Sequence, residues 1–336
     1  MKQKSALILI ILVSILTAQN TRYAASFLEL GVGARSLSMG GTGVASNGQV
    51  TDPFWNPAGL VMIDRIQAGS MFANLFNKLE QQSYLGLVVP LMKNSMIGFS
   101  WMRLSVDEIP RFEFDEDSPI TAYQRLHGQA QQLTYGPVDY FSNQNDAFIF
   151  SFARLFPTTL DLGWQYFEVP IKFGLGGNLK YISQQIDRNK ASGIGMDIGA
   201  IMSLNLSDIF TGEYYGNLNF GLNIQDLVET RLVWDTESRH ADRLHRNFKY
   251  GVQYSQPLPF INSELTLAYD VDSKYTGNTH LGAELLIKTH FALRVGSNSG
   301  HITAGAGLNL WKFFVNYAFQ GHDLGNSHRV SLIMTF

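Results

Sequence analysis

The sequence predicts an all-β protein, a transmembrane antiparallel β-barrel of about 14 strands. Three observations predict this fold: apolar and polar residues alternate along most of the chain, an export signal precedes them, and the candidate strands are even in number. Side chains of a strand point alternately to opposite faces, so each alternating segment has one apolar and one polar face. A membrane barrel turns the apolar faces to lipid and the polar faces to its lumen.

The alternation is clearest at the C-terminal end. The segment 311–320 places Phe313, Val315, Tyr317 and Phe319 on one face. The segment 327–336 places Val330, Leu332, Met334 and Phe336 on one face, opposite Arg329, Ser331 and Thr335. Both segments therefore read as strands with one lipid-facing side.

The same pattern begins near residue 66 and continues to the C-terminus. The candidate strands are 66–76, 82–89, 94–108, 145–153, 168–187, 191–205, 216–226, 246–255, 263–272, 277–287, 290–296, 301–309, 311–320 and 327–336. Tight turns on one side and longer loops on the other are typical of outer-membrane barrels. With both termini in the periplasm, this order puts the long polar connections 109–144 and 227–245 outside the cell.

Charged residues within the strands fall on the face opposite the apolar one. A charge on the lipid face at mid-membrane costs about 2–4 kcal/mol, so we expect these residues to line the lumen. They are Lys172, Lys180, Lys249, Glu264, Asp270, Glu284 and Arg294. A soluble β-sandwich alternates in the same way, and the export signal, the low charge and aromatics near strand ends favour the barrel over it.

Composition excludes several classes of protein. Only 16% of the 336 residues are charged, and the net charge of -3 argues against a nucleic-acid partner. The absence of cysteine excludes disulfides, thiol catalysis and a zinc–thiolate site. The histidines and the acidic run Glu113–Asp117 lack the spacing of a metal site or a catalytic triad, so we expect no enzyme, no catalytic residue, no metal and no cofactor.

Residues 1–18 read as a signal peptide. Lys2 and Lys4 form a basic start, and the apolar stretch 6–16 is too short to cross a bilayer. An N-terminal membrane anchor is the alternative. With the barrel pattern, the signal predicts the outer membrane of a Gram-negative-type bacterium, where lipid is the first partner of the chain.

Residues 19–65 differ from the barrel region 66–336. The stretch 31–60 is rich in Gly, Ser and Ala and shows no sustained alternation. Asp52 before Pro53 and Asn56 before Pro57 predict short helical turns, because Asp and Asn cap helices and proline suits their first position. This segment is therefore compact and rich in turns.

Two sequence motifs stand out in this segment. The first runs from Phe27 to Arg35 and continues through Ser38-Met39-Gly40-Gly41-Thr42 and Val44-Ala45, and the second is Trp55-Asn56-Pro57-Ala58-Gly59-Leu60. Together they resemble the PorV/PorQ family, which is similar to FadL-like outer-membrane barrels. Shorter matches, such as Leu293-Arg294-Val295-Gly296, extend the resemblance over most predicted strands but not over 109–165.

The resemblance implies that residues 19–65 form a hatch inside a barrel of fourteen strands. The hatch residues would be Arg35, Gly40, Gly41, Asn56, Pro57, Ala58 and Gly59, with Arg35 paired to Glu264, Asp270 or Glu284. It also implies that Phe336 is the signal read by the outer-membrane insertion machinery. A girdle aromatic is the other reading of Phe336.

Two functions follow from the resemblance. The first is a component of protein secretion, a type IX-like cargo shuttle whose secretion-system partners or secreted cargo bind loops 109–144 and 227–245. The alternative is a FadL-like transporter, in which a hydrophobic ligand binds outer aromatics such as Phe112, Phe114, Tyr123 and Tyr135 and then passes the hatch. An open diffusion porin is disfavoured because a hatch blocks the lumen.

Overall fold

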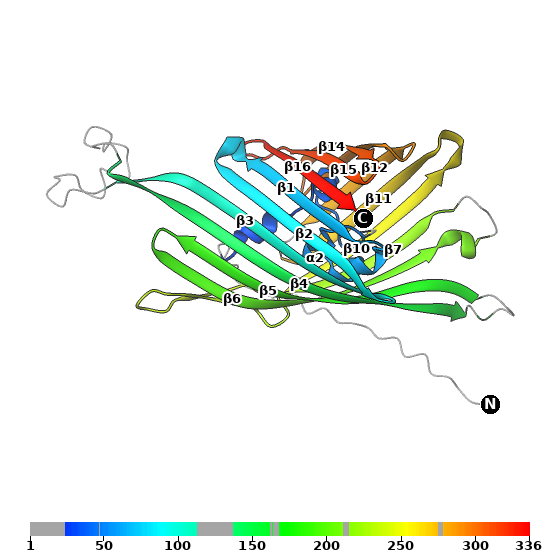
Figure 1. Ribbon diagram of the computed structural model, residues 1–336, viewed down its shortest axis with the longest axis horizontal. Helices are drawn as coiled ribbons and strands as arrows, with labels where there is room; N and C mark the ends of the chain where they lie inside the picture. Colours follow the sequence, from blue (N-terminus) through cyan, green and yellow to red (C-terminus); the bar gives the residue numbers. More distant parts are fainter. Residues whose placement is uncertain are drawn as a thin grey trace, which may run out of the picture.

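The computed structural model describes residues 24–46, 48–112, 137–161, 163, 168–210, 215–274 and 278–336. Sixteen strands in these ranges join into one antiparallel sheet, and fourteen of them close into a barrel (Figure 1). The ring closes where β1 pairs with β16, from Gln67 opposite Thr335 to Asn74 opposite His328. The predicted fold class is confirmed.

The barrel strands follow the chain order around the ring. They are β1 (Gln67–Leu75), β2 (Glu80–Met92), β3 (Ser95–Arg111), β4 (Asp139–Asp161), β5 (Glu168–Ile186), β6 (Asn189–Asn205), β7 (Asn217–Gln225), β10 (Asn247–Leu258), β11 (Ser263–Asp272), β12 (Thr279–Ile287), β13 (Phe291–Asn298), β14 (His301–Leu310), β15 (Phe313–Gln320) and β16 (Ser327–Thr335). Each corresponds to one predicted strand. Short 3-10 turns, η3 (Phe76–Lys78), η5 (Leu206–Asp208) and η6 (Pro259–Ile261), lie in the connections.

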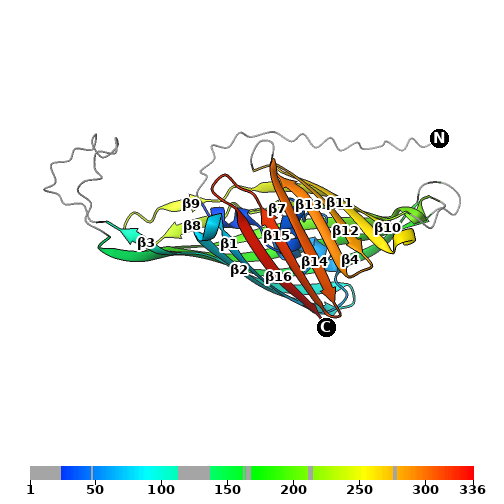
Figure 2. The same ribbon diagram turned by 90° about the horizontal axis from the view of Figure 1, so that it is seen from above.

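The wall of the barrel is taller on one side than on the other. Strands β3 to β6 have 17 to 23 residues, whereas β11 to β16 have 8 to 10. Figures 1 and 2 show the long strands running well past the short ones. Because β4 continues to Asp161, the connection that the sequence placed at 154–167 is mostly strand.

The outer connection 227–245 is not a plain loop. It contains β8 (Arg231–Trp234) and β9 (Ala241–Arg243), a hairpin that pairs with β6 at Ala191 and Ser192. β7 pairs with β6 only from Ile198 onward, so the hairpin extends the sheet beyond the end of β7. The sequence analysis missed both strands because they are short and surrounded by charged residues. The other long connection, predicted at 109–144, is shorter in the structure, because β3 continues to Arg111 and β4 begins at Asp139. It comprises residues 112–138, of which 113–136 lie outside the described residues.

The outward face of the barrel is apolar and ends in an aromatic row. Trp101, Phe148 and Tyr181 are neighbours on β3, β4 and β5. One step outward along the strands, Arg103 forms an ion pair with Asp146 at 2.7 Å. Aromatic rings favour the lipid–water interface and charges avoid hydrocarbon. The outer edge of the hydrocarbon layer therefore falls between these two rows.

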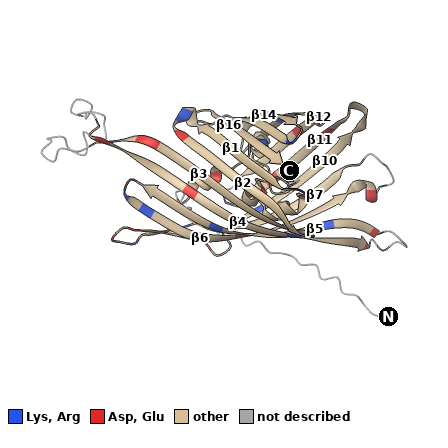
Figure 3. Cartoon of the chain, in the orientation of Figure 1, with Lys and Arg blue, Asp and Glu red and all other residues tan. Residues whose placement is uncertain are grey.

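Face assignments from the alternation agree with the exposure of the side chains. Tyr250 and Leu281, for example, are exposed, whereas Asp270, Glu284 and Arg294 are buried in the lumen. Figure 3 shows strands that are largely free of charge along the ring. The closed ring with an apolar exterior makes the chain a membrane barrel of the outer-membrane type.

Two neighbouring residues near the inner end of β5 depart from the alternation. Ile171, expected on the lipid face, is buried, and Lys172, expected in the lumen, is exposed. They lie beside the long ends of β4 and β6, where the wall continues beyond the ring of shorter strands.

Residues 24–63, here called the inner segment, fill the barrel. They form η1 (Ser26–Leu30), α1 (Ala34–Ser38), α2 (Asp52–Trp55) and η2 (Pro57–Met62). Most of their side chains are buried, α1 against β13 to β16 and η2 against β3 to β6. No helix among the described residues is long and apolar enough to cross a membrane.

Candidate functional site

The inner segment is held by polar side chains that point inward from the barrel wall. Each of its backbone groups must find a hydrogen-bond partner once it is buried. The wall residues that supply partners are Gln82, Tyr84, Asn178, Asn219, Asn223, Gln225, Asp270, His280, Glu284 and Thr303. The polar inward faces therefore bind the inner segment before they line any channel.

An arginine–glutamate–arginine cluster fixes the start of α1. Arg35 donates from Nε and Nη2 to the Glu284 carboxylate at 2.8 and 2.6 Å. Arg294, which stands opposite Glu284 on the neighbouring strand, donates from Nε to the same carboxylate at 2.5 Å. Of the three acids considered for Arg35, the structure pairs it with Glu284.

Gly40 lies against the wall at a position that only glycine fits. Its φ is +74°, and a Cβ there would lie 2.3 Å from the carbonyl oxygen of Leu281. Its N–H donates to Thr303 Oγ1 at 2.9 Å, and its carbonyl lies 2.9 Å from His280 Nδ1. Gly41 also has a left-handed φ, +82°, and faces His280.

Asp270 and Asn56 hold the next stretch of chain. The Asp270 carboxylate accepts the N–H groups of Gly43 and Val44 at 2.7 and 2.9 Å. Asn56 donates from Nδ2 to the carbonyls of Val44 and Ala200, and its Oδ1 accepts the N–H of Ala58. Asn56 therefore ties both halves of the inner segment to β6.

The other residues of the Asn-Pro-Ala-Gly motif fit closely into the fold. Pro57 and Ala58 pack over Gly176, where a Cβ would lie 2.5 Å from the Pro57 backbone. A Cβ on Gly59 would lie 2.6 Å from the Asp52 carboxylate. Both contacts require glycine, and the motif therefore serves as a packing element between η2 and β5.

Asp52 is a buried acid in the middle of the inner segment. Its carboxylate accepts the Gln49 N–H at 2.8 Å. Burial raises the pKa of Asp52 to about 7, and its hydrogen bonds and Arg35 offset only part of this effect. The charge of Asp52 therefore changes in the physiological pH range.

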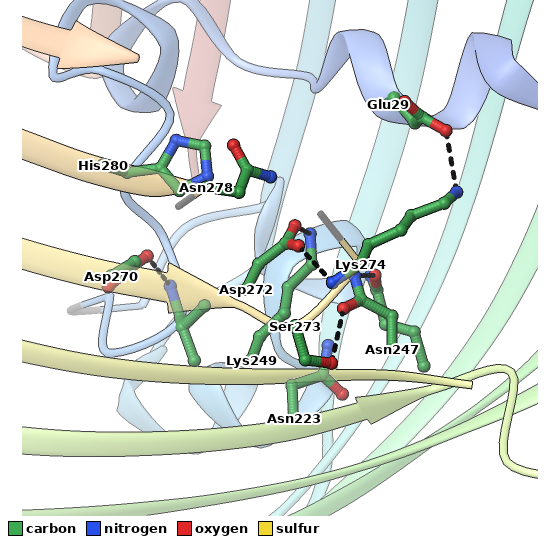
Figure 4. A network of polar contacts seen from close by, with 12 residues as sticks. Glu29, Asn223, Asn247, Lys249, Asp270, Asp272, Ser273, Lys274, Asn278 and His280 are labelled. Atoms are coloured by element: carbon green, nitrogen blue, oxygen red, sulfur yellow. Dashed lines mark hydrogen bonds and ion pairs between the residues drawn. The ribbon is translucent and has the colours of Figure 1, made fainter. Parts of the chain in front are cut away.

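A cavity of about 220 Å³ lies on the outer side of the inner segment. Its apolar floor includes Leu37, Phe54 and Trp55. Its polar wall is drawn in Figure 4, in which Lys249 approaches Asp272 at 3.7 Å and Lys274 pairs with Glu29 at 2.7 Å. The cavity therefore suits a small molecule with both an apolar and a polar part.

A second ion cluster closes one side of this outer cavity. Lys180 Nζ lies 2.7 Å from Asp197 and 3.0 Å from Asp226, and all three side chains are nearly excluded from solvent. Lys249 Nζ also lies 5.7 Å from the centre of the Trp55 ring. Each lysine in the wall of the cavity thus has an acidic partner.

A second cavity, of about 240 Å³, lies at the inner end of the barrel. Arg35, Gly48 and Gln49 line it from the inner segment, whereas Leu37 and Gly41 line the outer cavity. The described residues of the stretch 35–49 (35–46, 48 and 49), here called the partition, therefore separate the two cavities. Glu264 also lines the inner-end cavity.

The predicted site residues lie mainly around the partition. Lys180 and Lys249 are on the outer side, and Glu264 and Arg294 on the inner side. Phe336 is exposed at the inner end, and its N–H donates to the carbonyl of Ile66. Among the described residues, no group of three His, Cys, Asp or Glu side chains could hold a metal ion.

The sequence analysis missed several residues that hold the inner segment. Asn219, Asn223 and Thr303 bind its backbone, and Asp52 is buried within it. The alternation places Asn178 inward, where it also binds the inner segment, and the same rule applied to β7 would have identified the two other asparagines. No local signal marks the burial of Asp52.

No family model matches the chain, and no curated protein matches it. Among solved structures, the toluene transporter TodX of Pseudomonas putida is similar with a TM-score of 0.45 and 10% identity, over 91% of this chain and 96% of that one. The toluene transporter TbuX of Ralstonia pickettii gives 0.42 and 10%, over 91% and 97%. The autotransporter translocator domain of NalP from Neisseria meningitidis gives 0.34 and 10%, over 81% and 88%. Such distant likenesses carry no argument about function, and none is to a PorV/PorQ protein.

Proposed function

We propose that the chain transports small molecules with an apolar part across the outer membrane, with the inner segment acting as a hatch. The observation that carries this proposal is the partition. A single stretch of chain, 35–49, has an outer cavity on one side and an inner-end cavity on the other. Displacing it would join the two cavities into a path through the barrel.

The outer cavity is suited to the first binding step. Ligand sites are concave, with apolar walls and a few polar groups that orient the ligand. Leu37, Phe54 and Trp55 would contact the apolar part of the ligand. The Lys249–Asp272 pair would orient a polar group above them.

A role in protein secretion is the second candidate function, carried only by the sequence resemblance. It requires a broad exposed surface for a protein partner. Most of the connection 109–144 that would supply this surface lies outside the described residues. We therefore base the proposal on transport, and make a bound protein one outcome of its test.

A disulfide between the hatch and the wall tests the transport proposal. Val50 follows the partition directly, and a Cβ on Gly69 of β1 would lie 3.6 Å from the Val50 Cβ. This separation suits a disulfide. The chain has no cysteine, so the double variant Val50→Cys/Gly69→Cys would contain only this pair.

We expect uptake of radiolabelled benzyl alcohol, which has an apolar and a polar part, by whole cells to fall when the pair is oxidised and to recover on reduction. Each single-cysteine variant is the matched control, because it carries one change but forms no cross-link. Undiminished uptake by a fully cross-linked barrel would contradict a moving hatch. Two results together would favour secretion. One is a stoichiometric protein partner in barrels purified from native membranes, and the other is undiminished uptake by cells from which the gene for this protein has been deleted.

A further inference from the structure

Arg329 is a buried arginine inside the outer half of the barrel. It lies on β16 with Ala73 of β1 and Ala318 of β15 directly opposite on either side. These alanines leave room for its long side chain, which points into the lumen. The residue is only 2% exposed.

Arg329 has no counter-charge in the part of the chain that the structure describes. No acid there lies within ion-pair distance, and neither Nε nor Nη1 has a hydrogen-bond partner. By contrast, Arg35 and Arg294 pair with Glu284, and Arg103 pairs with Asp146. A buried charge without a partner is strongly disfavoured, so this exception calls for an anionic partner that the described residues do not supply.

Arg329 lines a cavity of about 390 Å³ that lies beside the outer cavity. η1 separates the two, because its residues Glu29 and Leu30 line both. The new cavity has an apolar part, formed by Phe27, Leu30, Phe76 and Leu104. Its polar part includes Arg329, Ser327, Gln320, His301 and His322.

Two acids also border this cavity, and neither neutralises Arg329. Glu29 pairs with Lys274 at 2.7 Å. Glu80, at the start of β2, forms no ion pair with Arg329. The arginine is thus the cation available to an anionic ligand at this place.

We propose that Arg329 binds the oxyanion group of a small organic anion whose apolar body lies against Phe27, Leu30, Phe76 and Leu104. The guanidinium suits this role because it presents N–H donors in a planar fork that matches a carboxylate. This inference rests on the proposed transport function. It specifies that the ligand is negatively charged and that Arg329 is the residue that recognises the charge.

Binding to the purified, folded barrel in detergent tests the inference. Three probes separate the sources of affinity: benzoate carries an anion and a ring, benzyl alcohol only the ring, and inorganic phosphate only the anion. The variant Arg329→Gln removes the charge from the cavity. Arg103→Gln is the matched control, because it removes a positive charge from the outward face at the same end of the barrel.

We expect benzoate to bind wild type more tightly than either other probe, and about ten- to a hundredfold more weakly to Arg329→Gln. Arg103→Gln should bind benzoate as wild type does, and Arg329→Lys should retain part of the affinity. Equal binding of benzoate and benzyl alcohol, or benzoate binding that Arg329→Gln leaves unchanged, would overturn the proposal. Phosphate binding as tight as benzoate binding would overturn the role of the apolar wall.

Stability of the empty barrel gives an independent readout. An arginine kept for ligand binding should not stabilise the empty protein, so Arg329→Met should unfold at the same or a higher temperature than wild type. A clear fall would make Arg329 a structural residue and refute the inference. Failure here leaves the transport proposal standing if the Val50–Gly69 cross-link still blocks uptake of benzyl alcohol.

Discussion

Replacing Glu284 by glutamine should loosen the partition. Glutamine keeps the shape of the side chain but removes the negative charge that Arg35 and Arg294 share at 2.6 and 2.5 Å. Removing one partner of a buried ion pair costs about 3–5 kcal/mol. Arg35 keeps 18% of its side chain in contact with solvent, so we expect the lower end, about 3 kcal/mol.

A loss of about 3 kcal/mol corresponds to roughly a hundredfold rise in the opening equilibrium of the partition. Hydrogen–deuterium exchange of peptides covering 35–46, measured by mass spectrometry, reports this equilibrium directly. Glu264→Gln is the matched control, since it removes a negative charge from the same cavity without breaking an ion pair. Exchange in Glu284→Gln within a few fold of the control would refute the assigned role of Glu284.

Three further substitutions test other parts of the structure. Gly40→Ala should speed exchange of the partition, because the new Cβ would lie 2.3 Å from the Leu281 carbonyl oxygen and φ is +74°. Burial raises the pKa of Asp52 from 3.8 to about 7, so the folded state binds the proton more tightly than the unfolded one. The contribution of Asp52 to the stability of the inner segment should therefore be fully present below about pH 4 and be lost as the pH rises through about 7, and Asp52→Asn should flatten the pH dependence of exchange in peptides 48–60 over this range. Phe336→Ser should lower the heat-modifiable, folded fraction in outer membranes if Phe336 is the insertion signal, whereas Leu310→Ser, another exposed residue at the inner end, should not.

The barrel could be predicted from the sequence because its signal is repeated and local. Lipid outside and water or polar groups inside impose the same two-residue period on every strand. A charged residue such as Asp270 or Arg294 would strongly destabilise the barrel if it faced the lipid. The same constraint explains why β8 and β9 were not predicted. They stand beyond the membrane boundary, where no lipid enforces the alternation.

Contacts between distant segments could be predicted only in part. Arg35 was expected to need an acid, but the sequence offered three, and the choice of Glu284 depends on how deep α1 sits in the ring. The pairing of Asp270 with Gly43 and Val44 depends on the same placement. The lack of a counter-charge for Arg329 among the described residues could not be predicted from the sequence, because it depends on which side chains the fold places around the guanidinium.

The contacts around the partition indicate which part of the inner segment can move. If Arg35 leaves Glu284, the carboxylate keeps Arg294 as its partner. If Gly43 and Val44 leave Asp270, Lys249 remains nearby, two positions along β10 from Gly251, the residue opposite Asp270. Opening the partition therefore leaves no acid buried alone.

The α2–η2 half of the inner segment offers no such exchange. Asn178 donates to the Pro53 carbonyl and Asn223 to the Trp55 carbonyl, each at 2.7 Å. Pulling this half away would leave buried neutral amides and backbone carbonyls without partners, and each such group costs about 1–3 kcal/mol. The barrel thus grips the α2–η2 half through neutral side chains alone, whereas the partition is held both by neutral bonds from Thr303, His280 and Asn219 and by two acids that keep a cation nearby. That asymmetry favours a hatch that opens by local displacement of 35–49 over one that leaves the barrel as a whole.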